Sequence, residues 1–415
     1  MTVSTSALVA ALTGRRPLST CETVVTLTPA AAATSAIPGC FFASLTPPHS
    51  AQIDLAGTLH DCVPTSQRAS VSAVKKILRC NICRAKRCNS GGGVTTQDRA
   101  RGALLGLAAG DALGAPTEGM TLHAIRERFG RVTGFLSDDA AGTDDTEYAV
   151  LCALGLLRHG REITSDDVAD LWMATVGEQQ GGFYGAGFSE MVAIANLRSG
   201  LRPPVSGSDS YETWSDGAAM RVAPVGILCS GDPAQAARIA AVDASVSHSR
   251  DGVYAAQAVA AAVAAALTGT TPAEVVAAGV AALPVDSWSA RLVARALEIA
   301  ASSGSPDEEL YAEISLFHYP WWDTAPEAVA LAFGLFSAYG ADFEQAVLAG
   351  VNIGRDSDTI AAVIGALAGA LHGAQAIPPI WRDQVTKVRG RCVTATAGTD
   401  LVELADRLRE LGTTG

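Results

Sequence analysis

Between Thr95 and the end of the chain, segments with the hydrophobic period of an amphipathic helix follow one another almost without a break. They cover residues 97–114, 144–160, 165–177, 218–229, 233–245, 252–268, 272–282, 287–302, 323–338, 342–352, 358–373 and 399–411. No part of this region alternates apolar and polar residues as a half-buried strand would. Helix-start signals at 165–167 and 271–274 support the pattern. The sequence therefore predicts an all-α fold, with one domain over residues 94–415 and no internal repeat.

The composition narrows the range of partners. Of the 415 residues 48% are hydrophobic and 17% are charged, which is enough to bury a large core. The formal net charge of -12 argues against nucleic acid, because binding to a phosphate backbone needs a basic face. The most apolar stretch, Val253 to Leu267, contains Gln257 and is too short to span a bilayer. We therefore expect neither a nucleic-acid nor a membrane partner.

The first 93 residues differ from the rest. They are rich in Ser, Thr, Ala and Pro, and they contain nine Lys or Arg but only three Asp or Glu. We predict that residues 1–93 are a disordered N-terminal extension without a packed core. Alternatively, they are sequence upstream of the natural start, and Val94 is then the candidate first residue. An organelle transit segment stays open as an alternative because acids are scarce. The short apolar run before Arg15 does not suit a signal peptide.

Six of the nine cysteines lie in this extension. Cys80, Cys83 and Cys88, with His60 or Cys62, are numerous enough to hold a zinc ion. Their spacing matches no strong finger pattern, so we predict no zinc site there. The three other cysteines lie in apolar or helical contexts and form no disulfide framework, which favours a reducing compartment, the cytoplasm.

Glycine recurs at every fourth position from Gly102 to Gly114. Each glycine costs a helix roughly 1 kcal/mol relative to alanine, but four of them on one face let another backbone approach closely. We therefore predict tight helix packing along this face. Asp111 lies in the same apolar segment and needs a partner or a metal ion. A second acid, Glu118, follows just beyond the helix end.

Two short acidic segments, GTDDTE at 142–147 and GRDSDT at 354–359, each begin an apolar helical stretch. One such segment alone is explained by a helix cap, with Thr or Asp at the N-cap and an acid three residues later. Two together are harder to explain, because neighbouring carboxylates repel and raise each other's pKa when buried. A hard divalent cation such as Mg²⁺, which prefers oxygen ligands, removes that repulsion. We predict one or two magnesium ions here, with helix N-termini leaving amides for a bound anion.

With these segments the chain resembles the ADP-ribosylglycohydrolase superfamily, which includes the dinitrogenase reductase-activating glycohydrolase type. The resemblance covers about Arg99 to Ile380, and shorter likenesses at 216–224 and 247–248 add to it. Three motifs carry it in this order: Gly110-Asp-Ala-Leu-Gly114 with Glu118, Thr143-Asp-Asp-Thr146, and Asp356-x-Asp358-Thr359. Each motif is weak alone, and the ordered set is specific.

The resemblance implies an orthogonal helical bundle with two magnesium ions in one site. The implied metal ligands are Thr143, Asp144, Asp145, Asp356, Asp358 and Thr359. Glu118, Asp144 and Asp145 are the implied candidates for positioning or deprotonating the attacking water. Substrate contacts are expected at Asp111, Gly142, Asp216, Gly217, Met220, His248, Gly354, Arg355 and Ser357.

Two of these positions depart from the family pattern. Arg355 replaces the second of two glycines, and Asp216 stands where many members have Asn. Both lie near the expected substrate. These departures therefore leave the identity of the leaving group open, and they bear less on the metal ligands. His248 is expected either to contact a ribose or phosphate or to have a purely structural role.

The implied activity is magnesium-dependent hydrolysis of the N- or O-glycosidic bond that joins ADP-ribose to a protein side chain, with release of ADP-ribose. One alternative is a hydrolase of small ribosides or nucleotide-derived metabolites that uses the same chemistry. A second is a protein that binds ADP-ribose without cleaving it. The expected partner is accordingly an ADP-ribosylated protein or a small ribosyl substrate.

Overall fold

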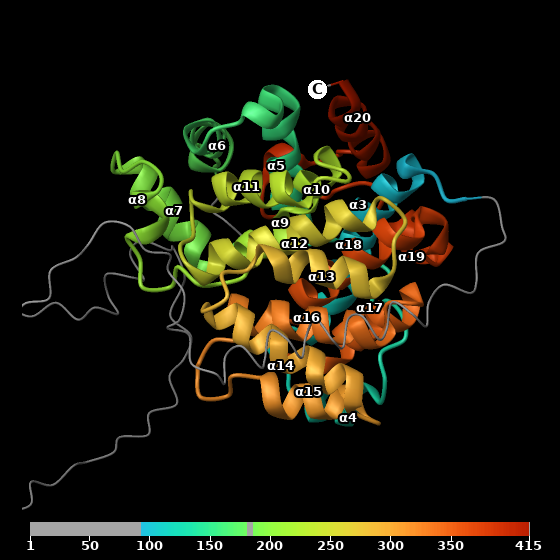
Figure 1. Ribbon diagram of the computed structural model, residues 1–415. Coiled ribbons are helices and arrows are strands. Elements are labelled where there is room, and N and C mark those ends of the chain that lie inside the picture. Colours follow the sequence, from blue (N-terminus) through green and yellow to red (C-terminus); the bar gives the residue numbers. More distant parts are fainter. Residues whose placement is uncertain (1–92, 181–185, 415) are drawn as a thin grey trace, which may run out of the picture. The chain divides into compact units, whose positions relative to one another are not determined.

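The computed structural model describes residues 93–180 and 186–414, and this part of the chain is helical without a β-strand (Figure 1). The all-α prediction is confirmed. The predicted extension, residues 1–93, lies outside the described residues except for Gly93. The helices are α3 (Thr96–Gly114), η1 (Ala115–Thr117), α4 (Leu122–Phe129), α5 (Asp144–His159), η2 (Gly160–Glu162), α6 (Ser165–Trp172), η3 (Met173–Gly177), α7 (Phe188–Arg198), α8 (Val205–Ser208), α9 (Gly217–Arg221), α10 (Ala223–Leu228), α11 (Pro233–Ala244), α12 (Asp251–Ala266), α13 (Pro272–Ala282), α14 (Trp288–Ser302), α15 (Pro306–Ile314), α16 (Ala325–Tyr339), α17 (Phe343–Ile353), α18 (Ser357–His372), η4 (Ala374–Ala376), α19 (Pro379–Val385), η5 (Thr394–Thr396) and α20 (Leu401–Thr414).

Most predicted helices are present within a few residues of their expected bounds, with one clear difference. The expected helix 218–229 is two helices, α9 and α10, which meet at Val222. Pro224 lies in the first turn of α10, where its missing amide cannot continue the hydrogen bonds of α9. The start signal at 271–274 is a complete capping box between Thr271 and Glu274.

Helices α3 and α18 pack against each other backbone to backbone, as the glycine spacing predicts. A Cβ atom on Gly106 would lie 2.1 Å from the carbonyl oxygen of Gly365, and one on Gly114 would lie 2.4 Å from that of Ser357. The two helices run in opposite directions, because Gly102 meets Gly369 at the other end of the contact. The end of α3 therefore lies beside the start of α18, which brings the first and last predicted motifs together.

We expect Gly106→Ala to destabilise the protein by about 3 kcal/mol or more, at the upper end of the cost of overpacking, because the new methyl group meets main-chain atoms that cannot rotate away. Urea unfolding followed by circular dichroism measures the change. The matched control is Gly304→Ala, because a Cβ at Gly304 has no atom within 4 Å. Equal unfolding midpoints for the two variants would contradict the proposed close contact.

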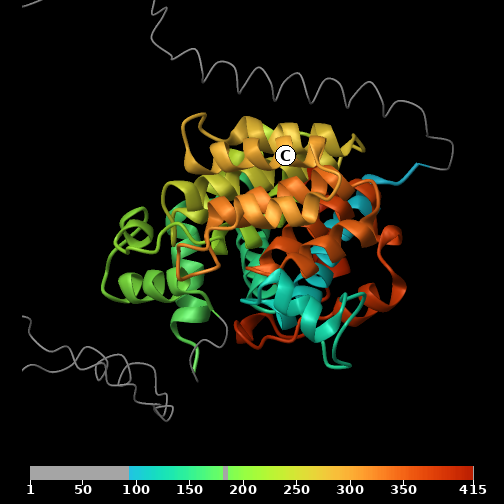
Figure 2. The same ribbon diagram turned by 90° about the horizontal axis from the view of Figure 1, so that it is seen from below.

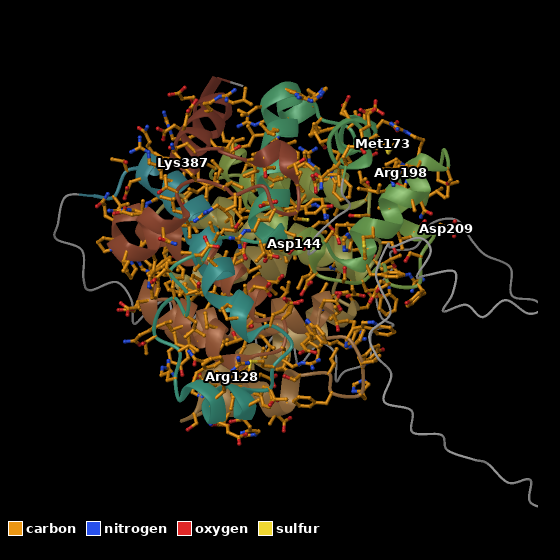
Figure 3. All side chains as sticks on the ribbon, turned by 180° about the vertical axis from the view of Figure 1, so that it is seen from behind. Arg128, Asp144, Met173, Arg198, Asp209 and Lys387 are labelled. Carbon is orange, nitrogen blue, oxygen red and sulfur yellow. The ribbon has the colours of Figure 1, made fainter. Side chains whose placement is uncertain are left out.

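Helix α12 packs against α9, α10, α11, α13, α16 and α18, so neighbours surround it (Figures 1 and 2). This explains the alanine-rich stretch from Val253 to Leu267, in which small side chains allow close packing on several sides at once. None of the described helices combines the length and apolar character needed to cross a bilayer. On the side of the fold shown in Figure 3, Asp144 lies near the middle, whereas Arg128, Asp209 and Lys387 lie toward the edge.

Candidate active site

A cavity of about 290 Å³ opens among the first turns of α5, α7, α9 and α18. Glu118, just after η1, and the 321–323 segment before α16 complete its walls. Its lining residues are Glu118, Thr143, Asp144, Asp145, Ala186, Gly187, Glu190, Ser215, Asp216, Gly217, Met220, Trp321, Trp322, Asp323, Asp356, Asp358 and Thr359. Eight of these side chains are carboxylic acids, and the lining contains neither Lys nor Arg.

The first acidic segment begins α5, but its own side chains do not cap that helix. Thr143 makes no side-chain capping bond. The cap is instead Asp111 of α3, whose carboxylate accepts hydrogen bonds from the backbone nitrogens of Thr143 at 2.8 Å and Thr146 at 3.0 Å. Glu147 accepts from the amides of residues 391–393. The capping-box alternative is therefore wrong here, and Asp144 and Asp145 line the cavity.

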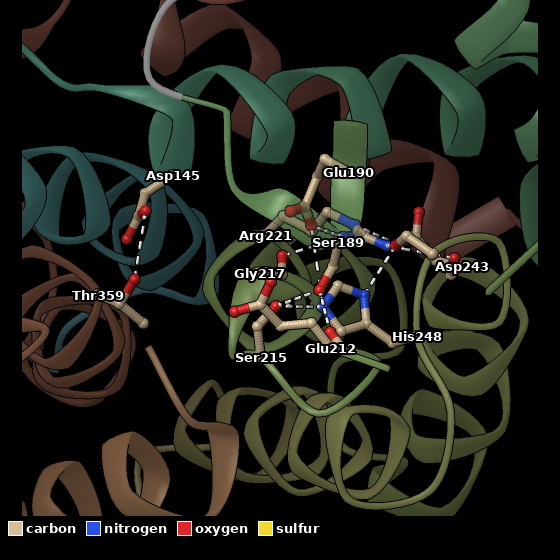
Figure 4. A network of polar contacts seen from close by, with 11 residues as sticks. Asp145, Ser189, Glu190, Glu212, Ser215, Gly217, Arg221, Asp243, His248 and Thr359 are labelled. Carbon is tan, nitrogen blue, oxygen red and sulfur yellow. Dashed lines mark hydrogen bonds and ion pairs between the residues drawn. The ribbon is translucent and has the colours of Figure 1, made fainter. Parts of the chain in front are cut away.

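The second acidic segment, at the start of α18, behaves in the same way. Asp356 occupies the N-cap position without a side-chain capping bond. Ser357 turns away from the cavity and donates to the carbonyl oxygen of Gly114 at 3.0 Å. The two segments meet where the Thr359 hydroxyl donates to Asp145 Oδ1 at 3.3 Å (Figure 4).

Burial and mutual repulsion make these carboxylates reluctant to ionise without a cation. Burial, followed by the charge of neighbouring carboxylates, raises the pKa of Asp144, Asp145 and Asp356 well above the usual range. Burial and then the charge of Glu118 raise the pKa of Asp358 to about 7.

The donor set fits a hard divalent cation. Carboxylate oxygens of Glu118, Asp356 and Asp358 lie within 4.8 Å of one another. Asp145 Oδ2 is buried and accepts no hydrogen bond from any described residue. Converging carboxylate and hydroxyl oxygens of this kind are the ligands that Mg²⁺ prefers.

The structure brings together only some of the predicted site residues. Those that line the cavity are Glu118, Thr143, Asp144, Asp145, Asp216, Gly217, Met220, Asp356, Asp358 and Thr359. Those that lie behind its walls are Asp111, Gly142, His248, Gly354, Arg355 and Ser357.

Several of the residues behind the cavity walls hold in place the loops that form those walls. A Cβ on Gly142 would lie 2.2 Å from Thr146 Oγ1, so only glycine lets the chain pass beneath the start of α5. Gly354 has φ of 74° and pairs with Thr121 in an isolated bridge. Arg355 has φ of 60°, and its guanidinium binds the buried carboxylate of Glu327. Arg355 thereby joins the start of α18 to the start of α16.

His248 belongs to a buried polar network beside the cavity (Figure 4). Its Nε2 lies 2.9 Å from Ser215 Oγ and its Nδ1 lies 2.8 Å from Ser247 Oγ. Burial, followed by the charge of Arg221, holds the pKa of His248 well below its usual value. The imidazole is therefore neutral at pH 7, and both ring nitrogens are already engaged, which favours the structural alternative.

The sequence comparisons agree with this geometry. The profile of the family described as ADP-ribosylglycohydrolase matches residues 93–415. The chain belongs to the ADP-ribosylglycohydrolase family. The ADP-ribosyl-[dinitrogen reductase] glycohydrolase of Rhodospirillum rubrum is 27% identical over 70% of this chain and 90% of that protein. The ADP-ribosylarginine hydrolase Tri1 of Pseudomonas putida is 28% identical over 69% of this chain and 74% of that protein. A solved structure titled ADP-ribosylglycohydrolase-related protein complex matches with a TM-score of 0.56 and 28% identity, over 76% of this chain and 99% of that one.

The cavity also contains residues that the sequence did not predict. Glu190 is fully buried in the first turn of α7, where an acid alone is typical of a helix start. Its carboxylate lies 3.2 Å from Arg221 and keeps Oε2 without a hydrogen-bond partner among the described residues. Trp321, Trp322 and Asp323 come from a segment in which no motif was visible. The pair of tryptophans beside an acid was the available signal.

Proposed function

We propose that the chain is a magnesium-dependent hydrolase that cleaves ADP-ribose from an arginine side chain of a protein. The observation that carries this proposal is an acidic wall, defined as Glu190, Asp216 and Asp323, which lines the cavity in addition to the acids of the two motifs. The reducing compartment expected from the sparse cysteines, the cytoplasm, is part of the same proposal.

The acidic wall matches the leaving group of an arginine linkage. Glu190 Oε2 and Asp216 Oδ2 are buried and accept no hydrogen bond from any described residue. Buried acceptors of this kind are costly unless a donor reaches them. A guanidinium group carries a positive charge and several N–H donors in a planar fork. A serine hydroxyl supplies neither the charge nor the set of donors.

We assign two Mg²⁺ ions to Thr143, Asp144, Asp145, Asp356, Asp358 and Thr359, the cavity residues of the two acidic motifs. Bound magnesium would lower the pKa of a water and hold the ribose hydroxyls. The assignment is supported by the unpartnered carboxylate oxygen of Asp145 and by the finding that neither Thr143 nor Asp356 caps its own helix with its side chain.

The chain's own carboxylates then have two tasks. Glu118, Asp144 or Asp145 takes one proton from the attacking water, whose oxygen forms the new bond to the anomeric carbon. The bond between that carbon and the guanidine nitrogen breaks, and the nitrogen takes up a proton, so no net proton is released. Asp216 and Asp323 hold the departing guanidinium, and the buried ion pair of Glu190 with Arg221 fixes this side of the wall.

The test is a substrate panel incubated with magnesium and with a chelator. We expect release of ADP-ribose from arginine-linked peptides, with much slower cleavage of serine-linked peptides and nucleosides. Asp323→Asn should lower kcat/KM for the arginine-linked peptide by about 10- to 100-fold, because it removes charge but keeps shape. Asp209→Asn, at an exposed aspartate, is the control. Preferred cleavage of the serine-linked peptide or of a nucleoside would refute the arginine assignment.

A further inference from the structure

We infer that the aromatic rim of the cavity, together with Arg250 and Arg291, is a docking surface for the polypeptide that carries the modified arginine. The aromatic rim is defined as Phe188, Tyr211, Trp321 and Trp322. This inference rests on the proposed function and adds the chemistry of the partner, which is an extended segment that places apolar side chains on the rim and carboxylates against the two arginines.

Exposed aromatic side chains lie in and beside the mouth of the cavity. Phe188, Tyr211, Trp321 and Trp322 are 37–73% exposed, and Trp321 and Trp322 line the cavity itself. The ring of Tyr211 lies between those of Phe188, at 5.4 Å, and Trp321, at 6.0 Å. Trp, Tyr and Arg are the residues most enriched where protein interfaces derive their binding energy. An exposed aromatic set of this kind indicates an interaction surface.

The surface continues away from the cavity. A small hollow of about 80 Å³ shares Ser215, Trp321 and Asp323 with the cavity. The same hollow shares Trp214 and Tyr319 with a larger one of about 540 Å³. The small hollow therefore adjoins both the cavity and the large hollow, and it connects them along the surface.

The large hollow combines aromatic rings with two arginines. Trp288 packs against Trp214 at 5.9 Å and against Tyr319 at 5.6 Å. Arg250 and Arg291 also line this hollow, at the starts of α12 and α14. The hollow therefore offers both apolar and cationic contacts.

The two guanidinium groups keep donors for a partner. Arg291 Nη1 donates to the carbonyl oxygen of Asp286, and Asp251 and Asp286 both line the same hollow. The Asp251 carboxylate accepts from the backbone nitrogen and the hydroxyl of Ser289, in the first turn of α14. Arg250 also has φ of 48°, a conformation that glycine adopts more easily. Strained positions of this kind concentrate where a side chain has a function.

A nucleotide would also suit aromatic rings and arginines, but the position of the acidic wall favours a polypeptide. Asp323 and Ser215 belong both to the cavity and to the small hollow. The cavity therefore opens toward the rim on the side where the proposed function places the departing guanidinium. The polypeptide attached to that guanidinium must leave the cavity on this side.

The test uses Arg250→Gly with Arg291→Gln, which removes both guanidinium groups and relieves the strain at position 250. The substrates are ADP-ribosyl-arginine and two short peptides with one ADP-ribosylated arginine, flanked by Asp and Leu in one and by Lys and Leu in the other. We expect the wild-type protein to prefer the acidic peptide about tenfold in kcat/KM. The variant should lose this preference, with ADP-ribosyl-arginine cleaved within about twofold of the wild-type rate. Arg131→Gln with Arg407→Gln, which removes the same charge elsewhere, is the control.

A preference that survives in the double variant, or an equal loss for all three substrates, overturns the docking surface. Equal loss would indicate that the arginines contact the nucleotide. Fluorescence anisotropy with the labelled, unmodified acidic peptide separates docking from catalysis. If the wild-type protein cleaves none of the substrates, the proposed function fails. Weaker binding of this peptide to the double variant would still support docking, and unchanged binding would overturn it.

Discussion

Asp358→Ala is expected to lower the single-turnover rate of ADP-ribose release by about 10²- to 10⁴-fold. Removing one partner from a buried set of opposite charges, here the cation with its carboxylates, costs about 3–5 kcal/mol, and each 1.36 kcal/mol corresponds to tenfold in rate. Asp358 is 5% exposed, lines the cavity and lies within 4.8 Å of two other carboxylates. The remaining acids would be unable to hold the cation with the same affinity.

Thermal unfolding with and without magnesium checks the reason for this loss. The wild-type protein should be stabilised by magnesium, because a ligand that binds only the folded state raises its stability. Asp358→Ala should lose most of that response, yet without metal it should be at least as stable as the wild-type protein, because one repelling charge is gone. Asp209→Ala is the control. Normal magnesium affinity of the Asp358 variant by calorimetry would refute its assignment as a ligand.

The fold could be predicted where local periodicity decides the structure. The long helices α3, α12 and α18 show a continuous apolar or glycine pattern, and each was predicted within two residues of its bounds. The short helices α4, α7, α15 and α19 span two to three turns, which is too little for a period to stand out. Their stability comes from packing against distant residues, which one local window of sequence does not contain.

The same reasoning explains which site residues could be predicted. Asp144 and Asp358 lie in compact motifs whose repeated acids are costly to bury, so the motif itself signals a cation. Asp323 is far from both motifs in sequence and reaches the cavity only because the segment before α16 pairs with the start of α9. That pairing is visible as the hydrogen bond from the Asp216 nitrogen to the Asp323 carbonyl oxygen at 2.9 Å. Such long-range contacts leave no periodic trace in the sequence.

The departure at Arg355 has a structural explanation of the same long-range kind. Its side chain binds Glu327, and that carboxylate also accepts from the backbone nitrogen of Leu316. The segment that carries Trp322 is therefore tied at its first residues to the start of α18. Trp322 Nε1 in turn donates to Glu118 Oε1 at 3.1 Å. Arg355, where the family has glycine, thus helps to hold the cavity wall that contacts Glu118.

Glu118→Gln tests whether this acid acts on the water or holds the metal. The change keeps the shape and most hydrogen bonds but removes the charge. If Glu118 positions or deprotonates the attacking water, the single-turnover rate should fall by about 10²- to 10⁴-fold, the usual range for a general acid–base group. The affinity for ADP-ribose should change little, because binding depends on the metal ligands and the ribose contacts.

Glu118 also lies within 4.8 Å of Asp356 and Asp358, so a ligand role makes a different and measurable prediction. In that case Glu118→Gln would weaken the binding of magnesium and of ADP-ribose together, which calorimetry on the same variant detects. Trp322→Phe is the companion variant, because it keeps an aromatic side chain, smaller than the indole, and removes the donor to Glu118. If that hydrogen bond orients a water-activating carboxylate, the rate should fall by about 10-fold or somewhat more, at the lower end of the effect of a charged hydrogen bond, with magnesium affinity unchanged. An unchanged single-turnover rate in Glu118→Gln under saturating magnesium would remove Glu118 from the mechanism.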